Sequence, residues 1–214
     1  MPAPQNVILP LSMHLGAPAK PVVNKGDKIA VISEDSIAVT TFFKILMGEL
    51  EADNGTFKFG QTITTAFLPN ENEQYFQSDD NLIDWLREYS DGEKDEVYIR
   101  GFLGKMLFTG QETLKKCNVL SGGEKVRCMI SRMMLQGANL LILDEPTNHL
   151  DLESITAFNN ALKAFPGTVL FTSHDHTFTQ TVANRIVSLS PDNIIDKLGT
   201  YEDYLASVEN ELVV

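Results

Sequence analysis

The chain has 214 residues, a length that suits one domain with a substantial core. Its apolar content of 43% and charged content of 21% are ordinary for a globular protein. The net charge of −12 argues against unspecific binding to nucleic acid or an anionic membrane, which needs a basic surface, although a localised basic patch is compatible with it.

The first third of the chain reads as strands around one helix. Asn6–His14 resembles an edge strand because a proline interrupts it, and Lys28–Ile32 is a β-branched run typical of a buried strand. Apolar residues at helical spacing predict a helix over Thr40–Leu50. Gly55–Gly60 and Gln61–Leu68 then read as a hairpin strand and a core strand.

The middle of the chain changes to helical periodicity, and the last third alternates strand and helix. From about residue 71 to 136 the pattern predicts a helical insertion, closed by a helix over Gly122–Leu135. The elements expected after it are Leu140–Leu143 (strand), Leu152–Ala164 (helix), Thr168–Thr172 (strand), Thr177–Asn184 (helix) and Arg185–Leu189 (strand). This alternation predicts an α/β fold, a mostly parallel sheet covered on both faces. The tail Ser207–Val214 is expected to fray or to serve as a contact.

An apolar strand delivers two carboxylates, Asp144 and Glu145, at its C-terminal end, the edge where open α/β sheets bind ligands. The first carboxylate suits Mg²⁺, and the second is placed to orient or deprotonate an attacking water. An isolated Asp-Glu-Pro more often just terminates a strand. Its extension to DEPTNHLD, after LSGGE upstream, favours the functional interpretation.

A histidine and a glycine turn complete the candidate site. His174 ends the strand Thr168–Thr172, where it is placed to hydrogen-bond a terminal phosphate or its attacking water; alone, such a histidine is more often a cap or a core residue. Ser121, Gly122 and Gly123 open a helix, where backbone amides and the helix dipole favour an anion. The alternative is a plain serine-capped helix with Glu124 in its first turn.

Together these segments resemble an ATP-binding cassette. Leu120–Arg127 (LSGGEKVR), Asn139–Asp151 (NLLILDEPTNHLD) and Ser173–Asp175 look like its signature, its Walker B motif with D-loop, and its switch histidine. DEPTNHLD and the ending Gly199–Leu205 (GTYEDYL) are similar to the ABC-F branch, which has no transmembrane partners and acts on ribosomes. The resemblance implies a P-loop NTPase (RecA-like) core with an antiparallel β edge and an inserted α-helical subdomain.

The phosphate-binding loop departs from that family. Ser33–Thr41 (SEDSIAVTT) stands where the family has G-P-N-G-x-G-K-S-T. The residues at the positions of the three glycines, the lysine and the two hydroxyl residues are, in order, Ser33, Ser36, Ala38, Val39, Thr40 and Thr41. Loss of the lysine removes a charge-assisted bond of roughly 1.5–3 kcal/mol. Glu34 and Asp35 make the field repulsive to a polyphosphate.

Other positions of the chain match the family pattern in part. The Q-loop glutamine is replaced by Asn70, and neither Met13 nor His14 is a convincing residue for stacking on adenine. Thr40 and Asp144 keep the pattern of the family's Mg²⁺ contacts. Asp151 stands at the D-loop position, and Ser121–Glu124 stand where the family contacts a partner's ATP.

The resemblance implies ATP and Mg²⁺ as cofactors and a second cassette as partner, in a homo- or heterodimer. It leads to three hypotheses. The first is an ABC-F-like cassette whose own ATP site is impaired but whose signature completes a partner's site. The second is an ATPase that tolerates the altered loop and uses Thr40, Asp144, Glu145 and His174. The third is a non-enzymatic pseudo-cassette that binds a ribosome or protein partner.

The expected organisation is one nucleotide-binding domain over residues 1–214, with a core of about 1–70 and 137–214 and a helical subdomain of about 71–136. No apolar run approaches the roughly 18 residues of a membrane span, and the start MPAPQN lacks the pattern of a secretory signal. Cys117 and Cys128 have no metal-ligand spacing and are expected to be free thiols. A cytoplasmic location follows, with no direct indication of nucleic-acid binding.

Overall fold

The computed structural model describes residues 7–8, 22–92, 95–190 and 194–212. Its main sheet has six strands in the order β4-β5-β6-β3-β7-β8. Their bounds are Lys28–Ser33 (β3), Thr65–Leu68 (β4), Leu140–Asp144 (β5), Thr168–Thr172 (β6), Arg185–Leu189 (β7) and Ile194–Leu198 (β8). All neighbours pair in parallel except β8, which is antiparallel to β7. This confirms the expected mostly parallel sheet with an antiparallel edge.

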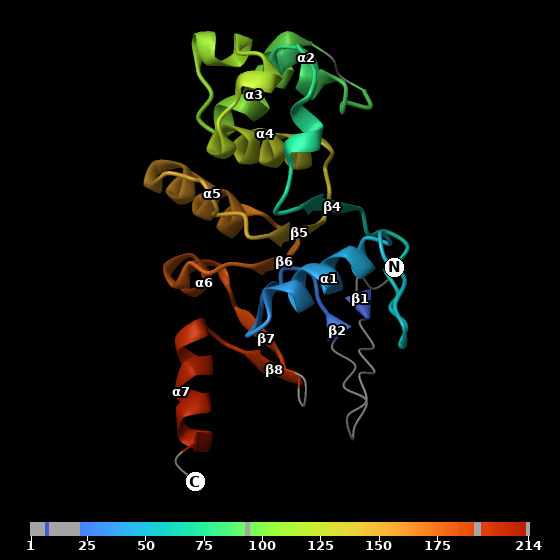
Figure 1. The fold of residues 1–214 in the computed structure, drawn as a ribbon, viewed down its shortest axis with the longest axis vertical. Coiled ribbons are helices and arrows are strands. Elements are labelled where there is room, and N and C mark those ends of the chain that lie inside the picture. The colour runs from blue at the N-terminus through green and yellow to red at the C-terminus, as the bar shows by residue number, and fades with distance from the viewer. Residues whose placement is uncertain (1–6, 9–21, 93–94, 191–193, 213–214) are drawn as a thin grey trace.

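Helices cover the sheet, and further helices lie beyond it at both ends of the molecule (Figure 1). The α-helices are Ser36–Leu46 (α1), Leu82–Arg87 (α2), Glu96–Lys105 (α3), Gly122–Leu135 (α4), Leu152–Ala164 (α5), His176–Val182 (α6) and Tyr201–Leu212 (α7). The 3₁₀ helices are Glu73–Phe76 (η1), Gly110–Leu114 (η2) and Cys117–Val119 (η3). In Figure 1, α2, α3 and α4 gather at one end of the molecule, whereas α7 lies at the other.

The sheet separates two hydrophobic clusters because successive strand residues point to opposite faces. Leu140 and Ile142 belong to the cluster that also contains Phe43 of α1. Leu141 and Leu143 belong to the larger cluster, which includes the side chains of the helical region 71–136. The division of the chain into a core and a helical subdomain itself stays a prediction.

The first helix differs from the expectation at both ends. It spans Ser36–Leu46 rather than Thr40–Leu50, because the Asp35 carboxylate caps its start. It stops before Gly48, which has a φ of 75°, and the amides of Gly48 and Glu49 bond back to the carbonyls of Ile45 and Lys44. This is the Schellman arrangement that terminates helices at glycine.

The other differences concern short or terminal segments. Between residues 55 and 68, only Thr65–Leu68 is a strand of the sheet. Of the expected strand Asn6–His14, Val7–Ile8 forms β1, which pairs antiparallel with β2 (Val22–Val23); the rest lies outside the described residues. The sequence pattern missed β8 and α7, and α7 continues through most of the tail that was expected to fray or to serve as a contact.

Among the described helices, none combines the length and the apolar character needed to cross a membrane.

Candidate functional site

The carboxylates that follow β5 are buried at the C-terminal end of that strand. Asp144 is 2% exposed and Glu145 is 8% exposed. Oδ2 of Asp144 accepts a hydrogen bond from Oγ1 of Thr40 at 2.9 Å, whereas Oδ1 is buried without a partner in the described part of the chain. Burial raises the pKa of Asp144, although the Thr40 bond and the charge of Lys44 oppose that shift. The structure thus brings Thr40 and Asp144 together.

Glu145 and His174 also meet. The backbone amide of His174 donates to Oε2 of Glu145 at 3.2 Å, and Nε2 of His174 lies 3.6 Å from Oε1. The histidine side chain is 80% exposed, so it faces solvent while the carboxylate is buried. Burial raises the pKa of Glu145, and hydrogen bonding and charge from His174 reduce that rise. Glu145 also has a φ of 49°, a conformation that is costly outside glycine.

The segment expected to bind phosphate forms a short turn between β3 and α1. Only Glu34 and Asp35 separate these elements. Oδ1 of Asp35 accepts a hydrogen bond from the Ile37 amide at 2.9 Å, and its carbonyl accepts one from the Ala38 amide at 3.2 Å. The Asp35 amide donates to Oγ of Ser33 at 3.2 Å. Ser36, Ala38 and Thr41 therefore lie in a capped helix rather than in an open loop.

Val39, at the lysine position, points into the core. It is 1% exposed and lies in the cluster with Phe43 and Leu46 of the same helix. Thr40, the next residue, turns toward Asp144 instead. The helix thus buries the side chain that the family pattern assigns to phosphate contact and presents the hydroxyl assigned to Mg²⁺.

The signature turn is a complete capping box. Oγ of Ser121 accepts the Glu124 amide at 3.3 Å, and Oε2 of Glu124 accepts the Ser121 amide at 2.9 Å. Nζ of Lys115 lies 2.6 Å from the other carboxylate oxygen of Glu124. The capping box therefore agrees with the alternative of a plain serine-capped helix. The glycines that follow Ser121 also have a packing role.

Those glycines pack against the segment that follows β5. A Cβ on Gly123 would lie 2.5 Å from the carbonyl oxygen of His149, and one on Gly122 would lie 3.1 Å from the Cβ of His149. His149 itself has a φ of 65°. The close approach explains Gly123 in steric terms, independently of any ligand.

The same segment contacts the Q-loop position and begins α5. Nδ2 of Asn148 donates to Oδ1 of Asn70 at 3.3 Å. Asp151 caps α5 by accepting the Ser154 amide at 2.8 Å. Residues 146–151 therefore lie between the buried carboxylates, Asn70 and the start of α4.

Sequence reasoning missed three residues of this region. The role of Asp35 could have been predicted, because an aspartate directly before a helical run is a preferred N-cap. This residue marks the start of α1 correctly. Thr147 and Ser173 share a hydrogen bond of 2.8 Å between their hydroxyls, which ties the segment after β5 to the residue before His174. No short-range pattern reveals a pair that is 26 residues apart.

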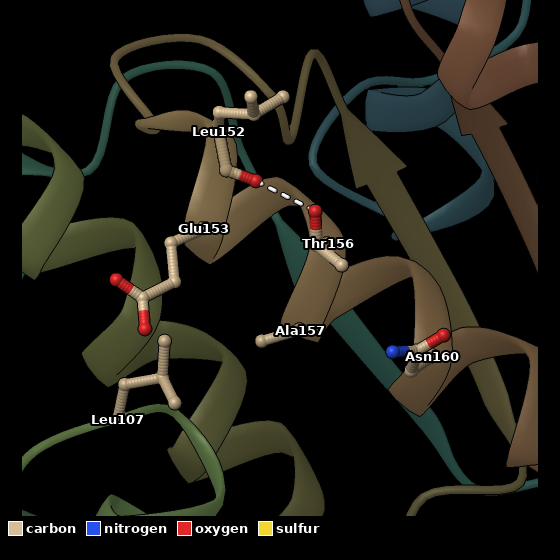
Figure 2. A pocket seen from close by; sticks show the side chains of 6 residues that line it. All are labelled: Leu107, Leu152, Glu153, Thr156, Ala157 and Asn160. Carbon is tan, nitrogen blue, oxygen red and sulfur yellow. Dashed lines mark hydrogen bonds between the residues drawn. The ribbon is translucent and has the colours of Figure 1, made fainter.

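An open pocket lies beside α5 (Figure 2). Its volume is about 600 Å³, and its lining consists of Leu107, Leu152, Glu153, Thr156, Ala157 and Asn160. Thr156 bonds back to the Leu152 carbonyl, so that hydroxyl is already satisfied within the helix (Figure 2). None of the residues predicted for the site lines this pocket, and the buried carboxylates remain the better candidate.

Comparison with known proteins agrees with the motifs. The family model described as ABC transporter matches residues 22–148. The uncharacterized ABC transporter ATP-binding protein YkpA of Bacillus subtilis (strain 168) is 58% identical over 189 residues, covering 88% of this chain and 35% of that protein. The energy-dependent translational throttle protein EttA of Escherichia coli (strain K12) is 31% identical over 192 residues, covering 85% of this chain and 34% of EttA.

Solved structures agree as well. A chain in the complex of archaeal ribosomal stalk protein aP1 and ribosome recycling factor aABCE1 superposes with a TM-score of 0.70 at 25% identity, covering 88% of this chain and 38% of that one. The chain spans about a third of the length of the curated relatives it matches. The family model covers more than half of the chain, and the mostly parallel sheet agrees with it. The chain therefore belongs to the ABC transporter family and is an ATP-binding cassette domain with a P-loop NTPase fold.

Proposed function

We propose that this cassette is ABC-F-like, that its own site does not grip ATP, and that its signature turn completes the ATP site of a partner cassette. The observation that carries the proposal is the β3–α1 turn. Asp35 bonds to the Ile37 amide, and α1 begins at Ser36. An open loop of backbone amides, the feature that holds a polyphosphate in this fold, is replaced by a closed turn.

The phosphates of ATP do not fit this turn. The Ile37 and Ala38 amides already have acceptors, and Val39 lies in the core. Glu34 and Asp35 are exposed carboxylates beside the helix start and repel a polyphosphate. No catalytic step through ATP in this chain's own site is therefore proposed.

Mg²⁺ fits the residues at the end of β5 better than the nucleotide fits the β3–α1 turn. Thr40 and Asp144 are the residues that would hold it, because Oδ1 of Asp144 is a buried acceptor without a partner among the described residues. Mg²⁺ usually keeps several waters and takes few protein ligands, so these two residues are enough for a partial site. When bound, such an ion neutralises charge on phosphate oxygens.

The signature turn, Ser121–Gly123, differs from the β3–α1 turn. Ser121–Gly123 open α4, a helix of 14 residues whose N-terminus favours an anion. The partner in this proposal is a second cassette, either another copy or a different chain. The name of EttA, a translational throttle protein, and the ABC-F resemblance support a role at the ribosome and a cytoplasmic location.

An active ATPase is the second candidate function. It is favoured by the contact of His174 with Glu145 and by the bond of Thr40 to Asp144, both of which match the hydrolytic arrangement of the family. In this reading Glu145 would act on the attacking water, and a nucleotide would have to open the turn at Asp35.

Calorimetric titration of the chain with Mg-ATP tests the proposal. We expect no tight binding by the unmodified chain, and binding after Ser33, Ser36 and Ala38 are changed to Gly and Val39 to Lys. Because Val39 is buried, the matched control carries the three glycines without the lysine. Tight binding by the unmodified chain contradicts the proposal and supports the active ATPase. Failure of every variant to bind places the loss beyond the turn and favours a non-enzymatic scaffold.

A further inference from the structure

The open pocket beside α5 has no part in the proposed function. Its aliphatic lining consists of Leu107, Leu152 and Ala157. Leu152 is 80% exposed, although it is a large apolar residue in the first turn of a regular helix. A single exposed leucine is ordinary on a protein surface, but this one stands at a pocket of about 600 Å³ with further aliphatic side chains beside it. The group is therefore a candidate docking surface.

The pocket has two walls from different parts of the chain. One wall is a stripe of α5, in which Leu152, Thr156 and Asn160 follow one another at four-residue spacing. This stripe extends over about 12 Å of helix. The other wall is Leu107, which lies across from Glu153 and Ala157 of α5 (Figure 2). A pocket that follows such a stripe suits a second helix, because the side chains of that helix repeat at the same spacing.

Leu107 reaches the pocket from a strained turn. Its φ is 66°, in the left-handed region that leucine rarely adopts. Its amide donates to the carbonyl of Gly104 and the Phe108 amide donates to that of Leu103, each at 3.1 Å, so the turn ends α3. Glycine is the usual residue at such a helix end and would adopt this conformation without strain. The leucine costs the fold energy and adds an aliphatic side chain to the pocket.

The charge at the pocket is negative. Glu153 lines it, is exposed, and forms no ion pair with any residue that the structure describes. None of the lining residues is basic. The Thr156 hydroxyl already donates to the Leu152 carbonyl at 2.8 Å, which leaves Glu153 and Asn160 as the polar groups for a partner. An aliphatic surface beside a free carboxylate is complementary to a partner that carries aliphatic and basic side chains together.

We propose that this pocket is a docking site for an amphipathic helix of another protein, with lysine or arginine beside its aliphatic side chains. The aliphatic side chains cover Leu107, Leu152 and Ala157, and a basic side chain pairs with Glu153. A second copy of this chain is a poor occupant, because two molecules with a net charge of −12 repel each other. Nucleic acid is a poor occupant as well, because its phosphates would meet Glu153. The docking needs no nucleotide and is separate from the function proposed above.

The test uses a synthetic helical peptide of about 14 residues, acetyl-LKKLLKLLKKLLKL-amide, titrated with the whole chain without nucleotide and followed by fluorescence anisotropy. A peptide of the same composition, with its leucines out of helical register, controls for general attraction to an acidic protein. The test variants are Leu152→Ser and Glu153→Gln. Their matched controls are Leu198→Ser, at a leucine that is 75% exposed on β8, and Glu202→Gln, which also removes a carboxylate from the first turn of a helix.

Leu152→Ser and Glu153→Gln should each weaken binding of the helical peptide at least about fivefold, whereas Leu198→Ser and Glu202→Gln should change it less than about twofold. Equal losses in the test and control variants overturn the proposal, because the attraction would then be general. Equal binding of the out-of-register peptide overturns it for the same reason. So does the absence of binding by the unmodified chain.

A second variant, Ala157→Lys, covers the case in which Leu152→Ser does not fold, which thermal unfolding will show. It adds a charge of the same sign as the peptide to the same stripe of α5, so it should also weaken binding, and an unchanged affinity contradicts the proposal. Sedimentation velocity tests the alternative occupant. Self-association of the unmodified chain that Leu152→Ser abolishes would assign the pocket to a second copy and overturn the proposal. The titration with Mg-ATP tests the proposed function separately, so the two can fail independently.

Discussion

Asp144 is a buried carboxylate whose position costs the fold stability. Its carboxylate is 2% exposed, it receives one hydrogen bond from Thr40, and its Oδ1 has no partner among the described residues. Burial raises its pKa because the charged form loses water that the protein does not replace. A buried acceptor left open in this way is typical of a site that awaits a cation.

We expect Asp144→Asn to stabilise the chain in the absence of metal by about 0.5–2 kcal/mol. The amide keeps the size of the side chain and an acceptor for Thr40 but removes the buried charge. Urea unfolding of both proteins at pH 7 measures the difference, and a destabilised variant would contradict the expectation.

The same substitution has a pH dependence of defined sign. Because the folded pKa of Asp144 is raised, the folded state binds the proton more readily than the unfolded state as the pH falls. The cost of the carboxylate is therefore full above its folded pKa and is relieved below it. The advantage of Asp144→Asn should shrink steadily as urea unfolding is repeated from pH 7 toward pH 4. A constant advantage would mean that charge is not the cause.

Among the elements, β3 is tied at both ends by polar contacts. At its start, Nζ of the buried Lys28 donates to the carbonyls of Phe165 and Gly167, each at 2.7 Å, and so fastens the strand to the connection between α5 and β6. At its far end the strand continues into the Asp35 turn. The position of that turn therefore depends on how firmly β3 is anchored.

We expect Lys28→Met to destabilise the chain by about 1–3 kcal/mol at pH 7, because two carbonyls lose their donor. Burial lowers the pKa of Lys28 from 10.5 to about 8. Between these values the unfolded state binds more protons than the folded state, so the unmodified chain gains stability as the pH rises. The deficit of Lys28→Met should thus grow between pH 8 and pH 10 in urea unfolding. A deficit that falls over this range would show that the charged form is the one preferred.

The elements that the sequence predicted best are those with long apolar patterns. The helices Gly122–Leu135 and Leu152–Ala164 and the strand Thr168–Thr172 have the bounds that periodicity indicates. The predicted start of α1 was wrong because the apolar spacing marks only the later part of the helix, whereas Asp35, a preferred cap, marks its start. Edge elements such as β8 were missed because tertiary pairing, rather than a local pattern, makes them strands.

The contacts of the candidate site also divide into those that the sequence could predict and those that it could not. The contacts of Thr40 with Asp144 and of Glu145 with His174 could be anticipated, because parallel strands bring their C-terminal ends to one edge. The burial of Val39 and the packing of Gly123 on His149 could not, since both depend on how helices lie against distant segments.

At the scale of the molecule, the helical region and the sheet meet where Gly123 touches His149. We expect Gly123→Ala to cost about 1–3 kcal/mol through overpacking, since the added methyl would lie 2.5 Å from a backbone oxygen. Gly122→Ala is the matched control, because its methyl would meet the His149 side chain at 3.1 Å, which can yield more easily. Thermal unfolding should rank Gly123→Ala clearly below Gly122→Ala, and the reverse order would refute the packing role.

The two hydrophobic clusters on opposite faces of the sheet separate the packing of α1 from that of α4. Val39 and Phe43 of α1 belong to one cluster, whereas Met129 and Met133 of the signature helix α4 belong to the other. Substitutions around α1 can therefore accumulate without repacking the side chains that support α4. The surface around the start of α4 can therefore keep its shape while the residues of α1 change.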